Sequence, residues 1–115
     1  MKVNPFTYLA IVLVTFSVSG CVTQPMYSWG AYEMNLYKYY KNPADLEKFG
    51  EKLVADFEYA EEKGLVVAPG LYAEYGYLLT ELERHEQAVV YFEKEKAAWP
   101  ESTLLMDKMI ASAQG

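Results

Sequence analysis

Apolar residues follow two different patterns along this chain of 115 residues. Residues 6–18 form an uncharged, largely apolar run after a lone Lys2, whereas from residue 27 onward apolar positions recur every three or four residues. The run is shorter than the roughly 20 residues that span a bilayer, and it fits the apolar region of a secretory signal peptide. The periodic remainder predicts amphipathic helices.

The periodic part predicts helices and no sheet. In its most regular stretch, Leu46, Phe49, Leu53 and Phe57 are separated by steps of three and four, which places them on one face of a helix. No segment of convincing length alternates between apolar and polar residues, so we expect no β-strand. Gly30 weakens the start of the first helix. We expect helices over residues 27–41, 44–63, 71–82 and 86–98, and a last helix that begins at Ser102.

Residues that favour helix ends support these boundaries. Asn42 precedes Pro43, which is typical of an N-cap followed by the first helical residue. Ser102 is the expected N-cap of the last helix. Gly64 is the expected C-cap of the second helix, with Leu65 placed to pack back onto the last turn.

The third and fourth predicted helices match the spacing of a tetratricopeptide repeat, in which two antiparallel helices touch at small residues surrounded by large ones. We expect Gly76 and Ala88 to face each other at this contact. Glu95 departs from the pattern, because alanine is usual at its position. The alternative is a helical hairpin that matches by chance. The matching positions are Tyr72, Gly76, Leu79, Ala88, Phe92 and Pro100.

The two earlier helices fit this spacing poorly and would form a degenerate repeat, with the last helix as a solvating cap. We therefore predict an all-α fold of tetratricopeptide-like antiparallel helical hairpins with a C-terminal capping helix, preceded by a signal peptide. The chain has room for one small domain, which we assign to residues 27–115.

A cysteine ends the apolar N-terminal segment. The sequence Val-Ser-Gly-Cys at positions 18–21 resembles the lipobox of bacterial lipoproteins. The resemblance implies that the signal peptide, residues 1–20, is removed and that Cys21 receives a diacylglycerol and an N-acyl chain. Residues 21–26 would then be a lipidated tether to the membrane. A buried cysteine at the end of a transmembrane helix is the alternative.

The residue after the cysteine bears on location. In enteric-type bacteria an aspartate there retains a lipoprotein in the inner membrane, but this chain has Val22. The resemblance therefore implies an outer-membrane lipoprotein that faces the periplasm. Apart from the covalent lipid we expect no cofactor. A single cysteine excludes an intramolecular disulfide and a single histidine excludes a multi-histidine metal site, so we expect no metal.

The charge and the polar residues argue against two classes of function. The formal net charge of -6 disfavours nucleic acid as a partner, because binding phosphates needs a basic face. His85 lies in a polar turn between Glu83 and Glu86, has no nucleophile motif around it, and is expected to be solvated. The other acidic residues belong to charged helical faces, whereas acid–base catalysis needs carboxylates in different environments across a cleft. We predict no catalytic residue and no enzyme.

Aromatic residues make up 16% of the chain, which exceeds the needs of one small core. Tyrosine and tryptophan combine a large contact area with a polar group and are enriched in interfaces. Their concentration at the start of the domain predicts a partner or glycan contact there, with core packing as the alternative. The candidate partner-binding residues are Tyr27, Trp29, Tyr32 and Tyr37.

Four segments spread over the chain resemble a single family. They begin at Pro25, Ala68, Tyr91 and Trp99 and read Pro-Met-Tyr-Ser-Trp-Gly-Ala-Tyr, Ala-Pro-Gly-Leu-Tyr-Ala-Glu-Tyr-Gly-Tyr, Tyr-Phe-Glu-Lys-Glu-Lys and Trp-Pro-Glu-Ser. They are similar to the small bacterial lipoproteins catalogued as domain of unknown function 4810. Members are often encoded beside a lipoprotein similar to the curli secretion channel and beside another small lipoprotein, which implies a shared envelope assembly.

Two functions agree with these observations. The first is a non-catalytic outer-membrane lipoprotein that docks to other envelope proteins, lipoproteins among them, and assembles with a secretion-channel-like lipoprotein. The alternative is a lipoprotein with an aromatic groove that binds peptidoglycan, another glycan or a peptide. Co-purification of a neighbouring lipoprotein would favour the first, and retention on isolated peptidoglycan the second.

Overall fold

The computed structural model describes Asn4, Gly20 and residues 26–115 of the chain. Apart from Asn4 and Gly20, the predicted signal peptide lies outside the described residues, and so does the predicted lipidation site Cys21. Within residues 26–115 the regular structure is helical, as predicted. The helices are α2 (Tyr32–Lys41), η2 (Pro43–Asp45), α3 (Leu46–Lys63), α4 (Leu71–Glu81), α5 (His85–Ala98), η3 (Pro100–Ser102) and α6 (Thr103–Gln114), where η marks a short 3-10 helix.

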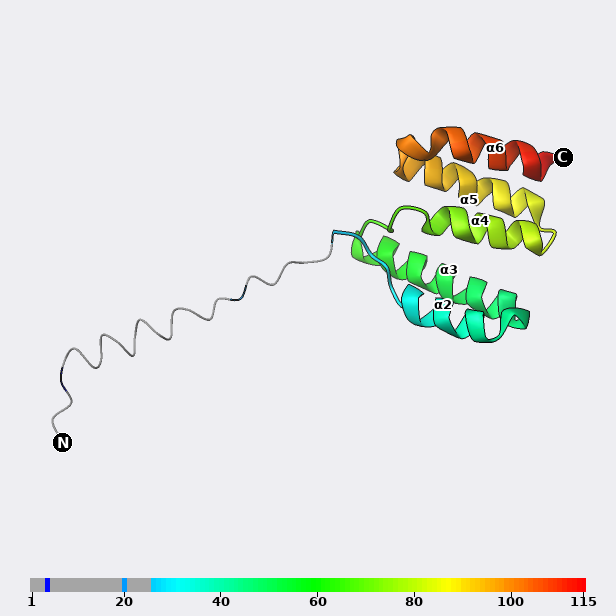
Figure 1. Ribbon diagram of the computed structural model, residues 1–115. Coiled ribbons are helices and arrows are strands. Elements are labelled where there is room, and N and C mark those ends of the chain that lie inside the picture. Colours follow the sequence, from blue (N-terminus) through cyan, green and yellow to red (C-terminus); the bar gives the residue numbers. More distant parts are fainter. Residues whose placement is uncertain (1–3, 5–19, 21–25) are drawn as a thin grey trace.

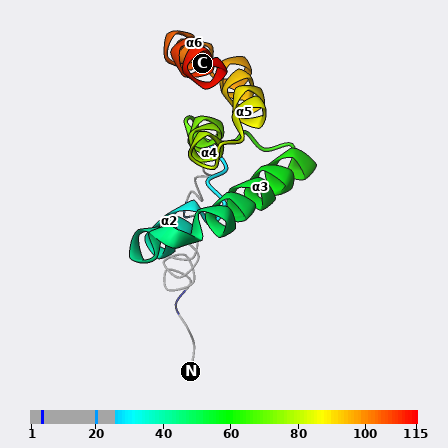
Figure 2. The ribbon, with the colours of Figure 1, turned by 90° about the vertical axis from the view of Figure 1, so that its right-hand side faces the viewer.

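The α-helices are stacked in chain order, and successive helices run in opposite directions (Figure 1). Figure 2 shows α4, α5 and α6 almost end-on, while α3 crosses the view obliquely. The segment that precedes α2 runs beside the connection between α3 and α4 (Figure 1). This connection therefore lies next to the point where the chain enters the domain.

The core consists of two clusters that meet at α4. Leu78 belongs to a cluster with α3 and with the connection that follows it, and Leu79 belongs to a second cluster with α5 and α6. Tyr75 and Tyr91 pack against both clusters, with ring centroids 4.5 Å apart and ring planes at 90°. Aromatic rings therefore fill the junction between the two halves of the domain. The fully buried side chains of greatest volume are Phe92, Leu53 and Leu79.

The first helix begins five residues later than predicted. Residues 26–31, which precede α2, form bends and a turn instead of a helix, and Ser28 forms an isolated parallel bridge with Val67. The Ser28 amide donates to the carbonyl of Val66 at 2.6 Å, and the Ala68 amide donates to the carbonyl of Ser28 at 3.1 Å. Gly30 then turns the chain into α2 with a left-handed φ of 53°. Backbone pairing with a distant segment therefore overrides the helical periodicity of this stretch.

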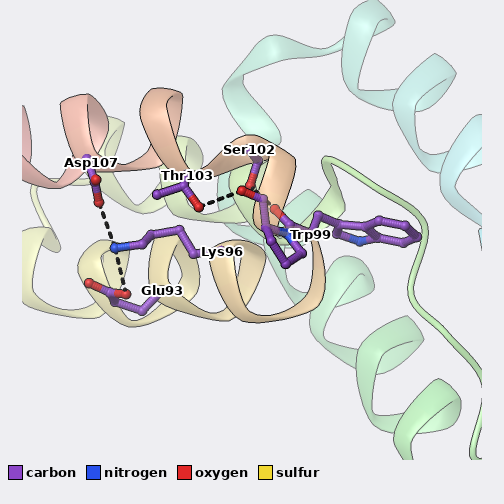
Figure 3. Close-up of polar contacts among 7 residues, drawn as sticks. Glu93, Lys96, Trp99, Ser102, Thr103 and Asp107 are labelled. Atoms are coloured by element: carbon purple, nitrogen blue, oxygen red, sulfur yellow. Dashed lines mark hydrogen bonds and ion pairs between the residues drawn. The ribbon is translucent and has the colours of Figure 1, made fainter.

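Asn42 and Ser102 occupy the predicted N-cap positions, of η2 and α6, but neither side chain makes a capping hydrogen bond, whereas the predicted C-cap is present. The Asn42 side chain donates to Asp45 Oδ2 at 2.8 Å and makes no capping bond. Ser102 Oγ donates backward to the Trp99 carbonyl at 2.7 Å (Figure 3). Asn42 precedes η2 and Ser102 ends η3, so each side chain bonds within a short 3-10 turn and not to the helix that follows. Gly64 ends α3 with a left-handed φ of 63°, as predicted.

The C-terminal turn of α3 is closed through the backbone. The Leu65 amide donates to the carbonyl of Ala60 at 2.8 Å, and the Gly64 amide donates to that of Glu61 at 3.2 Å. The Leu65 side chain was expected to pack back onto the helix, but it remains 49% exposed. The cap therefore leaves an aliphatic side chain on the surface beside the entry point of the chain.

The positions matched to the repeat pattern lie largely in the core. Tyr72, Gly76, Leu79, Ala88 and Phe92 are buried, and Pro100 begins η3 on the surface. The atoms nearest to the place of a Gly76 Cβ all belong to Phe92, the closest at 2.6 Å. The ring of Phe92, rather than the methyl group of Ala88, therefore covers Gly76 most closely.

Glu95, which departs from the repeat pattern, is only 2% exposed. Its Oε1 accepts a hydrogen bond of 2.7 Å from the backbone amide of Gly70, at the start of α4. The first amides of a helix lack partners within that helix, and glycine has no side chain to supply one. A carboxylate from α5 therefore accepts from one amide at the N-terminus of α4, a role that alanine could not fill.

Candidate functional site

Two of the four predicted partner-binding residues take part in packing within the domain. Tyr27 is half-buried and meets Trp99 edge-on, with ring centroids 5.1 Å apart. The indole of Trp99 points away from α6 toward the connection between α3 and α4 (Figure 3). The Tyr32 hydroxyl donates to Glu74 Oε2 at 2.6 Å, and the Tyr32 ring lies 6.4 Å from that of Phe49. These contacts hold the entering segment against α3, α4 and α5.

A carboxylate fixes the turn between Tyr27 and α2. The Ala31 amide donates to Asp56 Oδ2 at 3.2 Å, and the Asp56 carboxylate occupies the space that a side chain at Gly30 would need. Burial raises the pKa of Asp56 above its ordinary value, while the Ala31 amide and the charge of Lys52 act in the opposite direction. The entering segment is therefore tied to α3 by the Asp56 carboxylate and to the connection after α3 by backbone bonds.

The other two predicted residues are exposed. Tyr37 is 60% exposed on α2, and the Lys41 ammonium lies 4.9 Å from its ring centroid. Trp29 is 45% exposed. It lies in a shallow surface depression that we call the tether patch, and no residue lining it in the described part of the chain is charged. The tether patch is lined by Met26, Tyr27, Ser28, Trp29, Gly30, Tyr59, Leu65 and Val66.

A second surface feature, the α2–α4 groove, combines aromatic and acidic side chains. Tyr39 of α2 stacks on Phe49 of α3 with ring centroids 5.1 Å apart, and Tyr77 of α4 is 53% exposed. The pKa of Tyr77 is raised above its ordinary value, mainly by the negative charge of Glu81 and next by a hydrogen bond between the Tyr77 and Glu81 side chains. Glu74 is held in place by the Tyr32 hydroxyl. The α2–α4 groove is lined by Tyr39, Leu46, Phe49, Glu74, Tyr77, Leu78 and Glu81.

This groove was not predicted from the sequence, although the residues that α4 contributes to it follow a recognisable helical spacing. Glu74, Tyr77, Leu78 and Glu81 follow the i, i+3, i+4, i+7 spacing of one helical face. The residues of α4 that match the repeat pattern, Gly76 among them, lie on the opposite face of this helix. The other wall comes from α2 and from the start of α3, about 30 residues earlier in the chain. Only tertiary packing brings the two walls together.

Of the polar residues considered for catalysis, Glu95 is buried, contrary to the expectation of a solvated acidic face, because it accepts the hydrogen bond from Gly70. The residues around the polar turn lie on the surface. His85 is exposed at the first position of α5, and its neighbours Glu83 and Glu86 are exposed as well. Within the described residues, no group of three or more histidine, cysteine, aspartate or glutamate side chains is placed to hold a metal ion. A search of the same residues also finds no helix whose length and hydropathy would allow it to cross a membrane.

Comparison with known proteins gives one match. No curated protein and no solved structure matches the chain. The family model described as "Domain of unknown function (DUF4810)" matches residues 26–109, which is well over half of the chain and nearly all of the helical part. The match covers both surfaces described above. The chain therefore belongs to the DUF4810 family.

Proposed function

We propose that the protein is a non-catalytic, lipid-anchored docking protein of the bacterial envelope. In this proposal Cys21 carries the lipid, Val22 directs the protein to the outer membrane, and the domain faces the periplasm. The lipobox-like sequence at positions 18–21 supports the anchor. The α2–α4 groove is the observation that carries the docking role, because it offers an apolar floor, the half-buried ring of Tyr39, the exposed ring of Tyr77 and carboxylates on one surface.

The composition of the groove indicates the chemistry of its partner. Phe49 and Leu78 provide an apolar floor, and Tyr39 and Tyr77 provide flat amphipathic walls. Tyrosine is enriched among the residues that dominate binding energy at protein interfaces. The carboxylate of Glu74 lies on the same surface as these rings, held by the Tyr32 hydroxyl. A partner segment with an apolar side chain flanked by lysine or arginine would satisfy this groove.

The arrangement of the helices supports the same role. We propose that α4 and α5 form a tetratricopeptide-like repeat, with α2 and α3 as a degenerate preceding repeat and α6 as the cap. Stacked helical hairpins create extended surfaces that bind partners along successive helices. The groove lies between the first helices of the two hairpins, α2 and α4, which is where a solenoid presents such a surface.

A matched pair of tyrosine variants tests the docking role. Tyr77 in the groove and Tyr59 in the tether patch are each 53% exposed, so their replacement by alanine removes the same side chain at equal exposure. The assay is cross-linking and co-purification, from native membranes, of the neighbouring lipoproteins that the family resemblance implies. Tyr77→Ala should weaken capture by roughly 30-fold, which corresponds to about 2 kcal/mol at a binding hot spot. Tyr59→Ala should leave capture unchanged.

Two other outcomes would count against docking through the groove. Equal capture by Tyr77→Ala and the unaltered protein would contradict docking through the groove. Retention of the domain on isolated peptidoglycan, without capture of a lipoprotein, would favour the glycan-binding alternative. The anchor is tested separately with a radioactive fatty acid, which should label the protein but not its Cys21→Ser variant.

A further inference from the structure

The tether patch is an exposed apolar surface built from three parts of the chain. Trp29 comes from the entering segment, Tyr59 from the last turns of α3, and Leu65 and Val66 from the connection to α4. Their side chains are between 45% and 53% exposed, and that of Met26 is 78% exposed. Large side chains of this kind gain free energy when they leave water, so a surface that gathers five of them fits an apolar contact.

The patch has a fixed shape. Ser28 is bonded on both sides to the connection between α3 and α4, and Tyr27 is packed against Trp99. Asp56 holds the following turn through the Ala31 amide. The exposed side chains of the patch are therefore presented on a braced backbone rather than on a loose terminal segment.

The distance to the lipid site identifies what lies opposite the patch. Met26, which lines the patch, follows Cys21 by five residues. Five residues reach at most about 18 Å even when fully extended. If Cys21 is lipidated, as the proposed function holds, the Met26 edge of the patch cannot be farther than this from the lipid–water boundary. No surface of the domain is tied more directly to the anchor than this one.

The residue types agree with a lipid interface. Tryptophan and tyrosine are enriched at the boundary between hydrocarbon and headgroups, because their rings have an apolar body and a polar edge. Trp29 and Tyr59 would occupy this boundary, with the aliphatic side chains of the patch beside them. The last turns of α3 also carry Glu58, Glu61 and Glu62. The contact would therefore depend on apolar insertion and not on attraction to anionic lipids.

We infer that the tether patch is a second membrane contact, which inserts Trp29 and Tyr59 into the lipid interface beside the acylated Cys21. This inference rests on the proposed lipid anchor. Two contacts orient the domain, whereas a lipid on a free tether would not. Tyr59 and Leu46 are thirteen positions apart on α3, which corresponds to roughly 20 Å along the helix axis. The end of the α2–α4 groove marked by Leu46 would thus be held away from the patch.

Brominated lipids provide a direct test in the full-length lipidated protein. The protein is reconstituted in phosphatidylcholine vesicles that contain lipids brominated near the headgroup, which quench nearby tryptophan fluorescence. In Trp99→Phe the remaining tryptophan is Trp29, and its emission should fall at least twofold relative to vesicles without bromine. Tyr59→Trp in a background of Trp29→Phe and Trp99→Phe should be quenched similarly. Tyr77→Trp in that background is the matched control and should not be quenched.

Vesicle flotation in the same samples separates the anchor from the patch. A protein that floats without quenching of Trp29 would leave the lipid anchor in place and overturn the membrane contact. Shielding of Trp29 from aqueous iodide without bromine quenching would also overturn it, since a protein or a second copy would then cover the patch. Failure to float would refute both the anchor and the contact that depends on it.

Discussion

Replacing Gly76 with alanine probes the closest contact between α4 and α5. The added Cβ would lie 2.6 Å from Cε1, 2.7 Å from Cδ1 and 3.1 Å from Cζ of Phe92. Carbon atoms normally pack at about 3.5–4.0 Å, so the ring would have to move by nearly 1 Å. Phe92 is 0% exposed and lies in the core cluster with Leu79 and Met106, so its ring cannot move out into water. Overpacking of this kind costs about 1–3 kcal/mol, whereas replacing glycine by alanine in a helix gains about 1 kcal/mol.

We expect Gly76→Ala to lower the free energy of unfolding by up to about 2 kcal/mol, because the cost of overpacking exceeds the gain in helix propensity. The assay is urea denaturation of the protein from Val22 onward, followed by circular dichroism. In a domain of this size, each kcal/mol corresponds to about 4–8 °C in Tm. Gly76→Leu should lower stability further, since its larger side chain meets the same ring.

Two control variants test whether the Phe92 ring causes this loss of stability. At Gly50, the nearest atoms to an added Cβ are Tyr75 Cε2 at 3.0 Å and Leu78 Cδ2 at 3.2 Å, both at the ends of side chains. Gly50→Ala should therefore stay within about 0.5 kcal/mol of the unaltered protein, because the helix gain offsets a milder contact. In a Phe92→Leu background, Gly76→Ala should no longer destabilise. Equal costs of Gly76→Ala with and without the ring would refute packing of Phe92 over Gly76.

Two further predictions concern buried or half-buried carboxylates. Burial raises the pKa of Asp56 in the folded protein, so the folded state binds this proton more tightly than the unfolded chain does. The stability that the bound proton contributes is present at pH values below the ordinary pKa and is lost as pH rises through the folded-state pKa. Asp56→Asn, whose amide oxygen can still accept from Ala31, should raise Tm near neutral pH and should lose this advantage in acid. A difference in Tm between Asp56→Asn and the unaltered protein that stays constant from about pH 3 to pH 7 would contradict this prediction. Glu95→Ala should cost about 1–3 kcal/mol in urea denaturation, because the Gly70 amide loses its acceptor, whereas Glu95→Gln keeps an accepting oxygen and should remain close to the unaltered protein.

Helical periodicity alone predicted most of the regular structure. The series through Leu53 and Phe57 identified the buried face of α3, and Gly64 marked its end. Both signals depend on residues within a few positions of each other, which is why the chain reveals them without tertiary information. The family resemblance, carried by segments across the chain, was confirmed by the match to residues 26–109.

The start of the domain depended on tertiary contacts. Residues 27–31 have helical spacing with the residues that follow, yet the Ser28 backbone pairs with the connection between α3 and α4. Distant contacts also decide how the aromatic residues are used, because Tyr27 meets Trp99 and Tyr32, the first residue of α2, donates to Glu74. Each of these partners lies some forty or more residues away in the chain. A local pattern has no information about such pairs.

Composition and spacing determined that this chain would form helices with an apolar stripe, because helix periodicity is a property of neighbouring residues. Tertiary structure alone decided which aromatic residues are left for function. Tyr27 and Tyr32 are used in contacts within the domain, whereas Trp29 is exposed on the tether patch. Tyr39 and Tyr77 come together as lining residues of the α2–α4 groove. Packing also buried Glu95, whose carboxylate looked like one more surface acid until the α4 N-terminus was placed beside it. The physical reason is that exposure and hydrogen bonding depend on neighbours in space, and here those neighbours come from different helices.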